Sequence, residues 1–425
     1  MEPVLLKNID QPDSHRLENY IQGGGFRGIK TALKLKSDNI IQMIKDSGLR
    51  GRGGAGFSTG LKWSFIPKDP GLPKYFLCNA DESEPGTFKD RLIMEKKPHL
   101  LLEGLMIGCY AIGADSGYIY IRGEYTNAEN RLEQAIEEAY DKGYLGQNIF
   151  GSDFSLDIHL HRGAGAYICG EETALLESIE GFRAQPRSKP PFPALAGLYH
   201  LPTVINNVET LACVPSILER GAPWFASIGS SKSPGPKLFS VSGHVRKPGV
   251  YEFPMGLTLQ KLIFDHCGGV RNDKTVKAVI PGGASAPVLT VSHLDTPMDF
   301  ESLAAIGSML GSAGVIVMDE TTCMVKTALV INRFFSHESC GKCTPCREGT
   351  PWMTQVLERI ENGNGRKGDV KLLESLCSGI FGRCFCALGD AAAMALGGFL
   401  KNFKDEFLHH IDHKVCLVES VSENI

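Results

Sequence analysis

The clearest chemistry in the sequence lies in three cysteines at two-residue gaps, Cys340, Cys343 and Cys346. Three thiolates in one short loop can bind neighbouring corners of an inorganic cluster, and a distant thiolate can bind the remaining corner, as in a [4Fe–4S] centre. The candidates for that fourth ligand are Cys377, Cys384 and Cys386. The pattern predicts a carrier of single electrons.

A zinc site and ordinary core cysteines are the alternatives for this triplet. Structural zinc usually takes its ligands from two separated Cys-x-x-Cys pairs, whereas the triplet places three ligands on one loop. Buried thiols without a ligand role have no reason to recur at this spacing. We therefore favour cluster ligation.

A glycine-rich segment at residues 51–60 is the second candidate site. Its Gly51, Gly53 and Gly56 match the dinucleotide-binding fingerprint, but that fingerprint requires a preceding strand, and the apolar spacing at 38–49 predicts a helix. We therefore reject an ordinary Rossmann site. The segment can still bind a ligand, because glycines let a ligand come close to the backbone and exposed amides bind phosphate. A flexible surface loop is the alternative for this segment alone.

Two polar loops follow predicted strands, where α/β folds place ligand contacts. The first, at 79–84, offers amide and carboxylate groups to ribityl or ribose hydroxyls. The second, at 163–173, combines glycines with Tyr167, whose flat face suits a ring, and with Glu171 and Glu172 at the start of a helix. A solvated acidic turn and simple helix capping are the alternatives.

The elements that position these loops alternate between strand and helix. We predict strands at 74–79, 117–122 and 156–161, and helices at 38–49, 98–114 and 127–142. This alternation indicates an α/β fold with a largely parallel sheet. The first domain is expected to cover 1–235.

The composition changes near Pro234. Two strand-like runs within 238–252 enclose a Lys-Pro-Gly turn, and a helix is predicted at 258–264, which indicates a small hairpin-plus-helix domain at 236–320. Helix formers dominate the last domain, 321–425, which carries the cysteine triplet. Its predicted helices are 323–337, 351–361, 370–378 and 390–399.

Composition and charge argue against several classes of protein. The 425 residues suffice for two or three domains. The formal net charge is -4 and acidic and basic residues are interspersed, so no basic patch points to nucleic acid or anionic lipid. The N-terminus lacks a secretory signal, and the apolar stretches near 100–114 and 302–318 are too short for a membrane span. The 13 cysteines are expected to be reduced thiols. We expect a cytoplasmic protein.

Four motifs, in this order, carry a resemblance to a known family: Gly-Arg-Gly-Gly-Ala-Gly-Phe from 51, Asn-Ala-Asp-Glu-Ser-Glu-Pro-Gly-Thr from 79, Gly-Ala-Gly-Ala-Tyr-Ile-Cys-Gly-Glu-Glu-Thr from 163, and Glu-Ser-Cys-Gly-Lys-Cys-Thr-Pro-Cys-Arg-Glu-Gly from 338. Through nearly its whole length the chain resembles the NADH-oxidising flavoprotein subunits of respiratory complex I, known in bacteria as the F subunits of NADH-quinone oxidoreductase. The resemblance implies a Rossmann-like domain for FMN and NADH, a ubiquitin-like (β-grasp) domain and a C-terminal helical bundle with one [4Fe–4S] cluster. Ser58 departs from the family, which usually has proline there.

The resemblance also implies the site residues. Those expected to face FMN are Gly51, Gly53, Lys62, Asn79, Asp81, Glu82, Gly170, Glu171, Asn206, Asn207 and Thr210. Those expected to contact NADH are Phe57, Phe65, Glu84, Tyr167, Glu172, Lys189 and Phe192, with Glu84, Tyr167 and Glu172 positioning hydride transfer. The implied cluster ligands are Cys340, Cys343, Cys346 and Cys386, the last because it precedes Ala387 and Leu388, which are also assigned to cofactor binding.

The implied activity is NADH dehydrogenase activity, in which hydride passes to FMN and electrons leave singly to the cluster and on towards quinone. The implied partners are a small [2Fe–2S] subunit and a larger iron–sulfur subunit, in a complex peripheral to the cytoplasmic side of the inner membrane. The alternative is the diaphorase subunit of a soluble NAD-linked hydrogenase or formate dehydrogenase, although such chains often carry further iron–sulfur domains and this sequence stops soon after Cys386. A scaffold that has lost its cofactors is disfavoured by the intact motifs.

Overall fold

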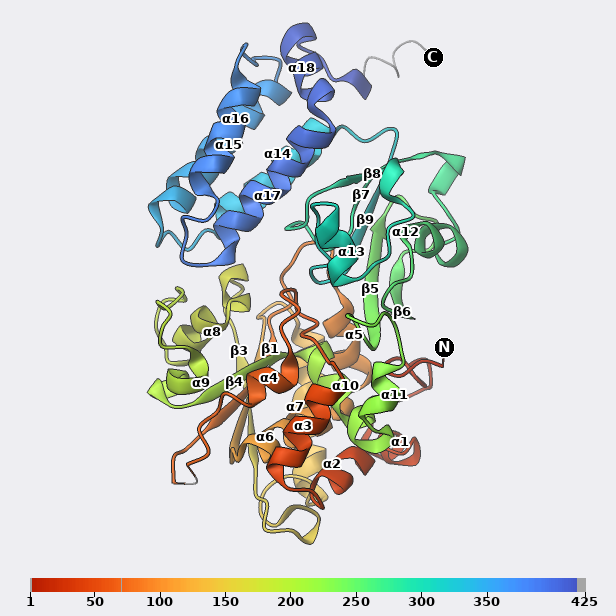
Figure 1. Cartoon of the computed structure of the whole chain (residues 1–425), viewed down its shortest axis with the longest axis vertical. Coiled ribbons are helices and arrows are strands. Elements are labelled where there is room, and N and C mark those ends of the chain that lie inside the picture. The colour runs from red at the N-terminus through yellow and green to blue at the C-terminus, as the bar shows by residue number, and fades with distance from the viewer. Residues whose placement is uncertain (1, 70, 419–425) are drawn as a thin grey trace. The chain divides into compact units, whose positions relative to one another are not determined.

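The computed structural model describes residues 2–69 and 71–418. The chain divides into two compact units, and each is described by itself (Figure 1). The first unit comprises Met1–Ser83, Phe88–Phe239 and Val250–Gly256, and the second comprises Glu84–Thr87, Ser240–Gly249 and Leu257–Ile425.

A four-stranded parallel sheet organises the first unit, in the order β3-β2-β1-β4. Its strands are β1 (Tyr75–Ala80), β2 (Ser116–Ile121), β3 (Asp157–Arg162) and β4 (Thr203–Asn207). The three strands predicted from sequence are confirmed to within one residue. The predictions did not include β4, which pairs with β1 on the side opposite β2. Successive strands from β1 through β2 to β3 are added on one side of β1, and β4 is then added on the other side. The switch point of the sheet therefore lies between β1 and β4, and open α/β sheets bind ligands at such a point.

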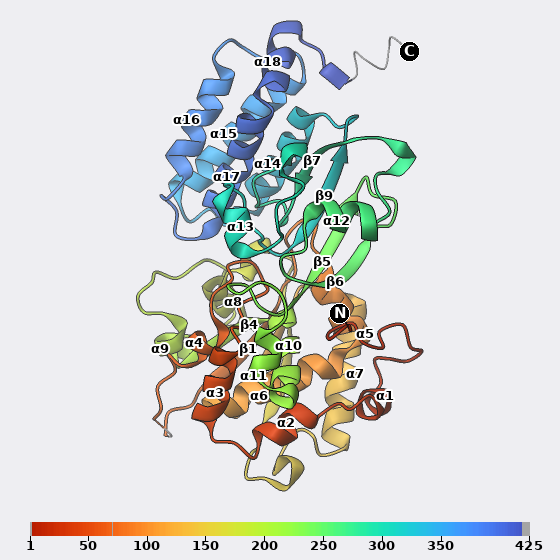
Figure 2. The ribbon, with the colours of Figure 1, turned by 45° about the vertical axis from the view of Figure 1, so that its right-hand side comes forward.

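Helices cover both faces of this sheet. Phe76 and Cys78 of β1 pack into the same core as α6, whereas Leu77, between them in sequence, packs with Leu175 and Leu176 of α8, as the alternation of side chains along a strand requires. Figure 2 shows this arrangement from a second direction. The helices of this unit are α1 (Leu17–Gln22), α2 (Arg27–Ala32), α3 (Ser37–Asp46), α4 (Thr59–Trp63), α5 (Lys89–Lys96), α6 (Pro98–Ile112), α7 (Thr126–Asp141), α8 (Glu172–Ile179), α9 (Pro193–Ala196), α10 (Val208–Arg220) and α11 (Ala222–Ala226).

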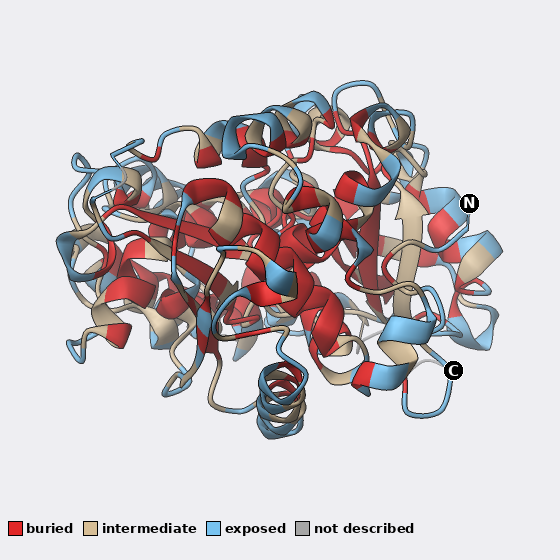
Figure 3. Ribbon diagram, turned by 90° about the horizontal axis from the view of Figure 1, so that it is seen from below, coloured by how far each residue is buried: buried red, intermediate tan, exposed pale blue. Residues whose placement is uncertain are grey.

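The most apolar helix, α6, is core, as predicted. It is buried on nearly every side, including Glu103, whose carboxylate accepts hydrogen bonds from the amides of Phe26 at 2.7 Å and Ile29 at 3.0 Å. The burial colouring in Figure 3 shows the same contrast between buried interior segments and exposed loops and outer turns. Among the described residues, every helix is too short or too polar to cross a bilayer.

A five-stranded mixed sheet follows along the chain, in the order β6-β5-β9-β7-β8. Its strands are β5 (Pro236–Gly243), β6 (Gly249–Pro254), β7 (Val276–Ile280), β8 (Leu289–Thr290) and β9 (Gly314–Asp319), and its short helices are α12 (Leu259–Lys261) and α13 (Phe300–Ala305). The two predicted strand-like runs around Lys-Pro-Gly are β5 and β6. The predicted helix at 258–264 is α12, which continues as a π-helical turn over Leu262–His266.

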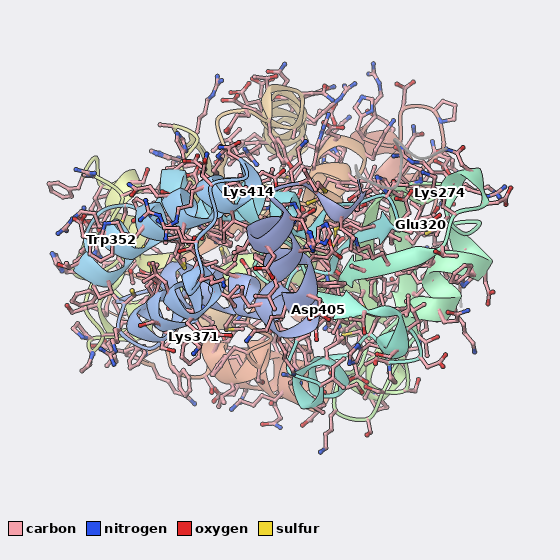
Figure 4. All side chains as sticks on the ribbon, turned by 90° about the horizontal axis from the view of Figure 1, so that it is seen from above. Lys274, Glu320, Trp352, Lys371, Asp405 and Lys414 are labelled. Carbon is pink, nitrogen blue, oxygen red and sulfur yellow. The ribbon has the colours of Figure 1, made fainter. Side chains whose placement is uncertain are left out.

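The second unit ends in a helical bundle of α14 (Met324–Glu338), α15 (Thr344–Glu361), α16 (Asp369–Ile380), α17 (Ala387–Asn402) and α18 (Lys404–His413). The last of these packs against each of the other four. Figure 4 views the chain from above with side chains drawn, and Trp352 on the exposed side of α15 is labelled.

Two predicted helix starts in this bundle are wrong, and both corrections concern cysteines. The helix predicted at 351–361 begins at Thr344, directly after Cys343, and the one predicted at 390–399 begins at Ala387, directly after Cys386. Pro351, the predicted start, lies inside α15. The true start is marked by Pro345 in the first turn, where proline costs no hydrogen bond.

Candidate functional site

The carboxyl ends of β1 and β4 bring three predicted site residues together. In the parallel register Asn79 lies opposite Asn207 and Cys78 opposite Asn206. The side-chain amide of Asn79 donates to the carbonyl of Gly170 at 2.9 Å, which ties the second polar loop to the end of β1. The switch point is therefore lined by residues from both polar loops.

The glycine-rich loop is closed by backbone pairing and lies against the start of α10. Arg50 and Ser58 form an antiparallel bridge, and the Gly51 amide donates to the Phe57 carbonyl at 2.8 Å. A Cβ atom on Gly53 would lie 3.0 Å from the Asn207 side chain, so glycine permits this close approach. The Arg52 amide donates to the Thr210 hydroxyl at 2.8 Å, which fixes the loop to α10.

Asn206 and Asn207, two predicted ligand contacts, hold in place the polar cradle formed by the glycine-rich loop and the ends of β1 and β4. Asn206 accepts a hydrogen bond from the buried indole of Trp63 at 2.7 Å. Asn207 caps α10 through the Thr210 amide at 3.3 Å and donates to Asp90 at 2.6 Å. The structure thus confirms that these residues meet, and it gives their side chains positioning partners within the protein.

Ser58, the one departure from the family pattern, is the N-cap of α4. Its hydroxyl accepts from the Leu61 amide at 3.4 Å, and serine is among the residues preferred at that position. The helix it caps carries Lys62. The serine therefore gives the end of the glycine-rich loop a hydrogen bond to the start of α4.

Lys62 lies in a cluster of four alternating charges with Glu172, Lys189 and Glu171. Its amine is 2.9 Å from one oxygen of Glu172, and Lys189 is 3.0 Å from the other and 2.9 Å from Glu171. Burial favours the protonated acid, but attraction to the two lysines outweighs it and lowers the pKa of Glu172 to about 2. The Glu172 carboxylate is therefore ionised throughout the neutral range.

The capping interpretation is correct for Glu171. Its Oε2 accepts from the amides of Thr173 at 2.8 Å and Ala174 at 2.9 Å, so it is the N-cap of α8. The same carboxylate reaches Lys189 through Oε1. One glutamate therefore starts the helix while its neighbour, Glu172, faces the lysines.

The carboxylates of the acidic loop at 79–84 lie in different environments. Asp81 lies next to Gly170 and accepts from the Ser83 hydroxyl at 3.0 Å. The Glu82 carboxylate instead accepts from the amides of Asp90 at 2.8 Å and Arg91 at 2.9 Å at the start of α5. Burial, followed by the nearby Asp90, raises the pKa of Glu82 to about 7.

Glu84 belongs to the second unit. Its carboxylate accepts from the amide of Ser285 at 2.7 Å and from the hydroxyl at 2.9 Å. The structure gives this carboxylate partners in its own unit, and its contact with NADH stays a prediction.

The aromatic residues predicted to contact a nucleotide are unusually exposed. Phe57 and Phe65 are each 51% exposed with their rings 6.3 Å apart, and Phe192 is 56% exposed. Tyr167 is half-buried on the turn before Gly170. Exposed rings beside a polar cradle provide flat apolar surface for a ring system.

The cluster cysteines converge in the second unit from two loops. The Phe385 amide donates to Cys343 Sγ at 3.3 Å, and Lys342 lies over the Phe385 ring at 5.0 Å, so the triplet loop and the loop before α17 lie side by side. The Ser339 hydroxyl lies 3.2 Å from Cys346 Sγ. Cys386 is the N-cap residue of α17.

Their spacing argues against zinc. A single zinc ion holds sulfur ligands within about 3.8 Å of one another, given its bond length and tetrahedral geometry. Within the described residues, no three of these cysteines have sulfur atoms all within 4.8 Å of one another. The wider spacing suits a cluster with its irons at separate corners.

Cys377 and Cys384, the other two candidates for the fourth ligand, each have a further contact for their sulfur atom. Cys377 contacts the thioether of Met353 at 3.8 Å, and Cys384 points to the Ile380 carbonyl at 3.8 Å and packs against Gly389. Burial raises the pKa of each thiol to about 12, helped at Cys384 by the nearby sulfurs of Cys346 and Cys343. Ala387 and Leu388 form the first turn of α17, and their contact with a cofactor stays a prediction.

Sequence reasoning missed the residues that hold the predicted site residues in place through hydrogen bonds. Trp63 and Asp90 have no motif of their own, and only the fold places them beside Asn206 and Asn207. Arg52 lies within the glycine-rich motif, but its amide contact with Thr210 also depends on the fold.

Comparison with known proteins finds three family models along the chain. The Nuo51 FMN-binding domain matches residues 44–216, the SLBB domain matches 237–317, and the NADH-ubiquinone oxidoreductase-F iron-sulfur binding region matches 326–410. The computed structure is also similar to the crystal structure of an NAD+-reducing [NiFe]-hydrogenase in the H2-reduced state, with a TM-score of 0.85 and 35% identity over 97% of this chain and 67% of that one.

Curated relatives match at higher identity. An F subunit of NADH-quinone oxidoreductase from Rhizobium meliloti (strain 1021) is 62% identical over 416 residues, covering 98% of this chain and 99% of the relative. The F subunit of the NADH-quinone oxidoreductase from Mycobacterium tuberculosis (strain ATCC 25618 / H37Rv) is 52% identical over 423 residues, covering 98% and 95%. The chain therefore belongs to the family of NADH-quinone oxidoreductase F subunits.

Proposed function

We propose that this chain is the NADH-oxidising subunit of a respiratory NADH-quinone oxidoreductase, with FMN and one [4Fe–4S] cluster as cofactors and NADH as substrate. The observation that carries the proposal is the joint presence of a glycine and amide cradle at a sheet switch point and a convergent set of cysteines in one chain. A cradle of this kind fits a flavin phosphate and ribityl chain, and the cysteines fit a cluster. Anaerobic reduction of both cofactors by NADH is the test.

The FMN residues fall into two groups under this proposal. The backbone of Gly51 and Gly53, with Asn79, Asp81 and Gly170, would line the cofactor, while Thr210 and the asparagines hold the loops. Lys62 would offer positive charge. For Glu82 we propose a backbone contact, because its carboxylate caps α5. Bound FMN supplies the conversion between a two-electron donor and a one-electron acceptor.

NADH recognition would rest on aromatic surface and on the four-charge cluster. Phe57, Phe65, Tyr167 and Phe192 provide rings for stacking, and Glu172 and Lys189 provide one acceptor and one donor held in fixed positions by each other. No proton donor is needed for hydride transfer, so these side chains act by orienting the substrate and excluding water.

For the cluster we propose Cys340, Cys343, Cys346 and Cys386 as ligands. Support comes from the loops that bring Cys343 beside residue 385 and from the contact of Cys377 with Met353. Cys384 lies near the sulfurs of Cys346 and Cys343, so the choice of Cys386 over Cys384 rests on its place directly before Ala387 and Leu388. An amide that donates to a ligating sulfur, as Phe385 does to Cys343, helps to tune the potential of a cluster.

We further propose the three-domain division 1–235, 236–320 and 321–425, which follows the positions of the three family models. The partners proposed are a small [2Fe–2S] subunit and a larger iron–sulfur subunit, in a complex that places this chain on the cytoplasmic side of the membrane.

A diaphorase subunit of an NAD-linked hydrogenase is the second candidate, favoured by the TM-score of 0.85. The relatives in NADH-quinone oxidoreductase are 62% and 52% identical, against 35% for the hydrogenase chain, so the first function is preferred. Co-purification separates the two, because a quinone reductase brings membrane subunits and a hydrogenase brings a nickel–iron subunit.

Glu172→Gln is expected to lower kcat/KM for NADH with an artificial acceptor by roughly tenfold or more, because a hydrogen bond to a charged group contributes about 1.5–3 kcal/mol. FMN content per chain should stay unchanged. The rate is measured with ferricyanide, and FMN is measured by fluorescence after release from the protein.

Glu177→Gln is the matched control for that variant. Glu177 lies on the same helix and forms an ion pair with Arg187 at 2.5 Å, and neither Lys62 nor Lys189 is its partner. Equal rates in the Glu172 and Glu177 variants would remove Glu172 from the NADH site.

A further inference from the structure

A second group of metal-ligating side chains lies in the helical bundle, separate from the cluster cysteines. In the described residues, Cys323, His410 and Cys416 form the one group of three or more such residues whose ligand atoms all lie within 4.8 Å of one another. All three belong to the second unit, where His410 is 1% exposed and Cys416 is 8% exposed.

The orientation of His410 is set by a hydrogen bond on the far side of its ring. Nδ1 lies 2.8 Å from the Glu406 carbonyl, one turn earlier in α18, and a carbonyl can only accept, so Nδ1 carries the proton. Nε2 then presents its lone pair, and it lies 3.5 Å from Cys323 Sγ. A histidine that donates its other N–H to a backbone carbonyl is the usual arrangement of a metal ligand.

Glu361 supplies a fourth donor atom. Its Oε2 lies 3.6 Å from His410 Nε2 and 3.9 Å from Cys323 Sγ. Zinc bond lengths of about 2.0–2.3 Å in a tetrahedron place neighbouring donors about 3.3–3.8 Å apart. The separations among Cys323, His410 and Glu361 are therefore close to those of a zinc site, whereas the Glu361 carboxylate lies outside the group of three whose ligand atoms are all within 4.8 Å of one another.

The four donors come from four separate segments. Cys323 is the N-cap of α14, where the Lys326 amide donates to its sulfur at 3.4 Å. Glu361 is the last residue of α15, His410 lies in the last turn of α18, and Cys416 follows Lys414, which Figure 4 labels just beyond that helix. An ion bound here would join the starts and ends of three helices to the chain beyond them.

We propose that Cys323, Glu361, His410 and Cys416 form a structural zinc site that fastens the C-terminal end of the helical bundle. Two thiolates, a neutral imidazole and a carboxylate are a ligand set that zinc accepts, and binding releases the thiol protons. A disulfide between the two cysteines is the competing arrangement, but it gives no role to a buried imidazole and a carboxylate directed at the same sulfur.

The test is the metal content of the full chain, purified in its complex without chelators and through a tag that lacks histidine. We expect about one zinc ion per chain beside the cluster iron. Cys323→Ser and Cys416→Ser should each lower the retained zinc at least about tenfold after dialysis, because a change of ligand costs at least as much affinity as a change in the groups that orient it. Iron should remain unchanged in both.

Cys377→Ser is the matched control, because Cys377 is a partly buried thiol of the same bundle whose sulfur contacts Met353. It should keep both zinc and iron. Zinc that stays equal in all three variants would overturn the proposal.

A measurement on the unmodified protein covers the case in which the variants fail to fold. The zinc X-ray absorption spectrum should show two sulfur neighbours at about 2.3 Å and nitrogen or oxygen neighbours at about 2.0–2.2 Å. Absence of zinc both before and after incubation with zinc salt would refute the site, as would a Cys323–Cys416 disulfide found by mass spectrometry.

Discussion

Cys343→Ser is expected to abolish the [4Fe–4S] cluster while leaving FMN bound. Cys343 lies between the other two cysteines of the triplet, is the N-cap residue of α15 and accepts the Phe385 amide, so it joins both loops of the cluster site. A serine oxygen is a poor replacement for a thiolate, and the cluster requires four thiolates. Iron, acid-labile sulfide and the EPR signal of the reduced protein should all fall to background, and the flavin content should equal that of the unmodified chain.

Cys384→Ser separates ligand loss from general damage to this region. Cys384 lies two residues before Cys386, but its sulfur points to the Ile380 carbonyl. The variant should keep its iron and its EPR signal. An intact signal in the Cys343 variant, or its loss in the Cys384 variant, would contradict the proposed ligand set.

Glu209→Gln is expected to destabilise the first unit by about 3–5 kcal/mol, because it removes the carboxylate that lies against two buried lysine amines. Glu209 is fully buried, lies 2.8 Å from the Lys89 amine and 2.6 Å from the Lys237 amine, and accepts from the Leu238 amide at 2.8 Å. Burial lowers the pKa of Lys237 to about 7 even with Glu209 present. Loss of the carboxylate would therefore drive Lys237 towards its neutral form, which places the expected cost near the lower end of the range.

The measurement is denaturant unfolding of the chain with its cofactors, compared with Glu219→Gln. Glu219 lies on the same helix, α10, and its ion pair with Arg27 spans 3.4 Å between exposed side chains. Such a surface pair contributes at most about 1 kcal/mol. Equal midpoints for the two variants would show that the buried charges are compensated by other groups.

The parts of the fold with strong local signals were predictable from sequence. The strands at 75–80 and 116–121 are mostly apolar and aromatic, and the strand at 157–162 alternates polar and apolar residues. α6 is mostly apolar, and α7 repeats apolar residues at helical spacing. The cysteine triplet and the glycine-rich loop indicated their chemistry because both depend on residue type and short spacing.

The remaining features depend on tertiary contacts. β4 is a short strand after a proline-rich loop, and its place beside β1 is set by the sheet. Glu82 is expected to face FMN, and only the fold shows that its carboxylate accepts from the amides at the start of α5. Cys323 lies 87 residues before His410, and it meets His410 and the nearby Cys416 only because α14 and α18 pack together.

The central claim is that one chain accepts hydride from NADH and passes single electrons to its own cluster. The measurement that tests it most directly is the optical and EPR spectrum of the anaerobically purified protein before and after addition of NADH. We predict a yellow-brown protein whose flavin absorption bleaches and whose reduced-cluster EPR signal develops, with both changes slower in the Glu172→Gln variant and the cluster signal absent from Cys343→Ser. A protein without flavin and iron, or one that holds both and stays oxidised with NADH, would contradict the claim.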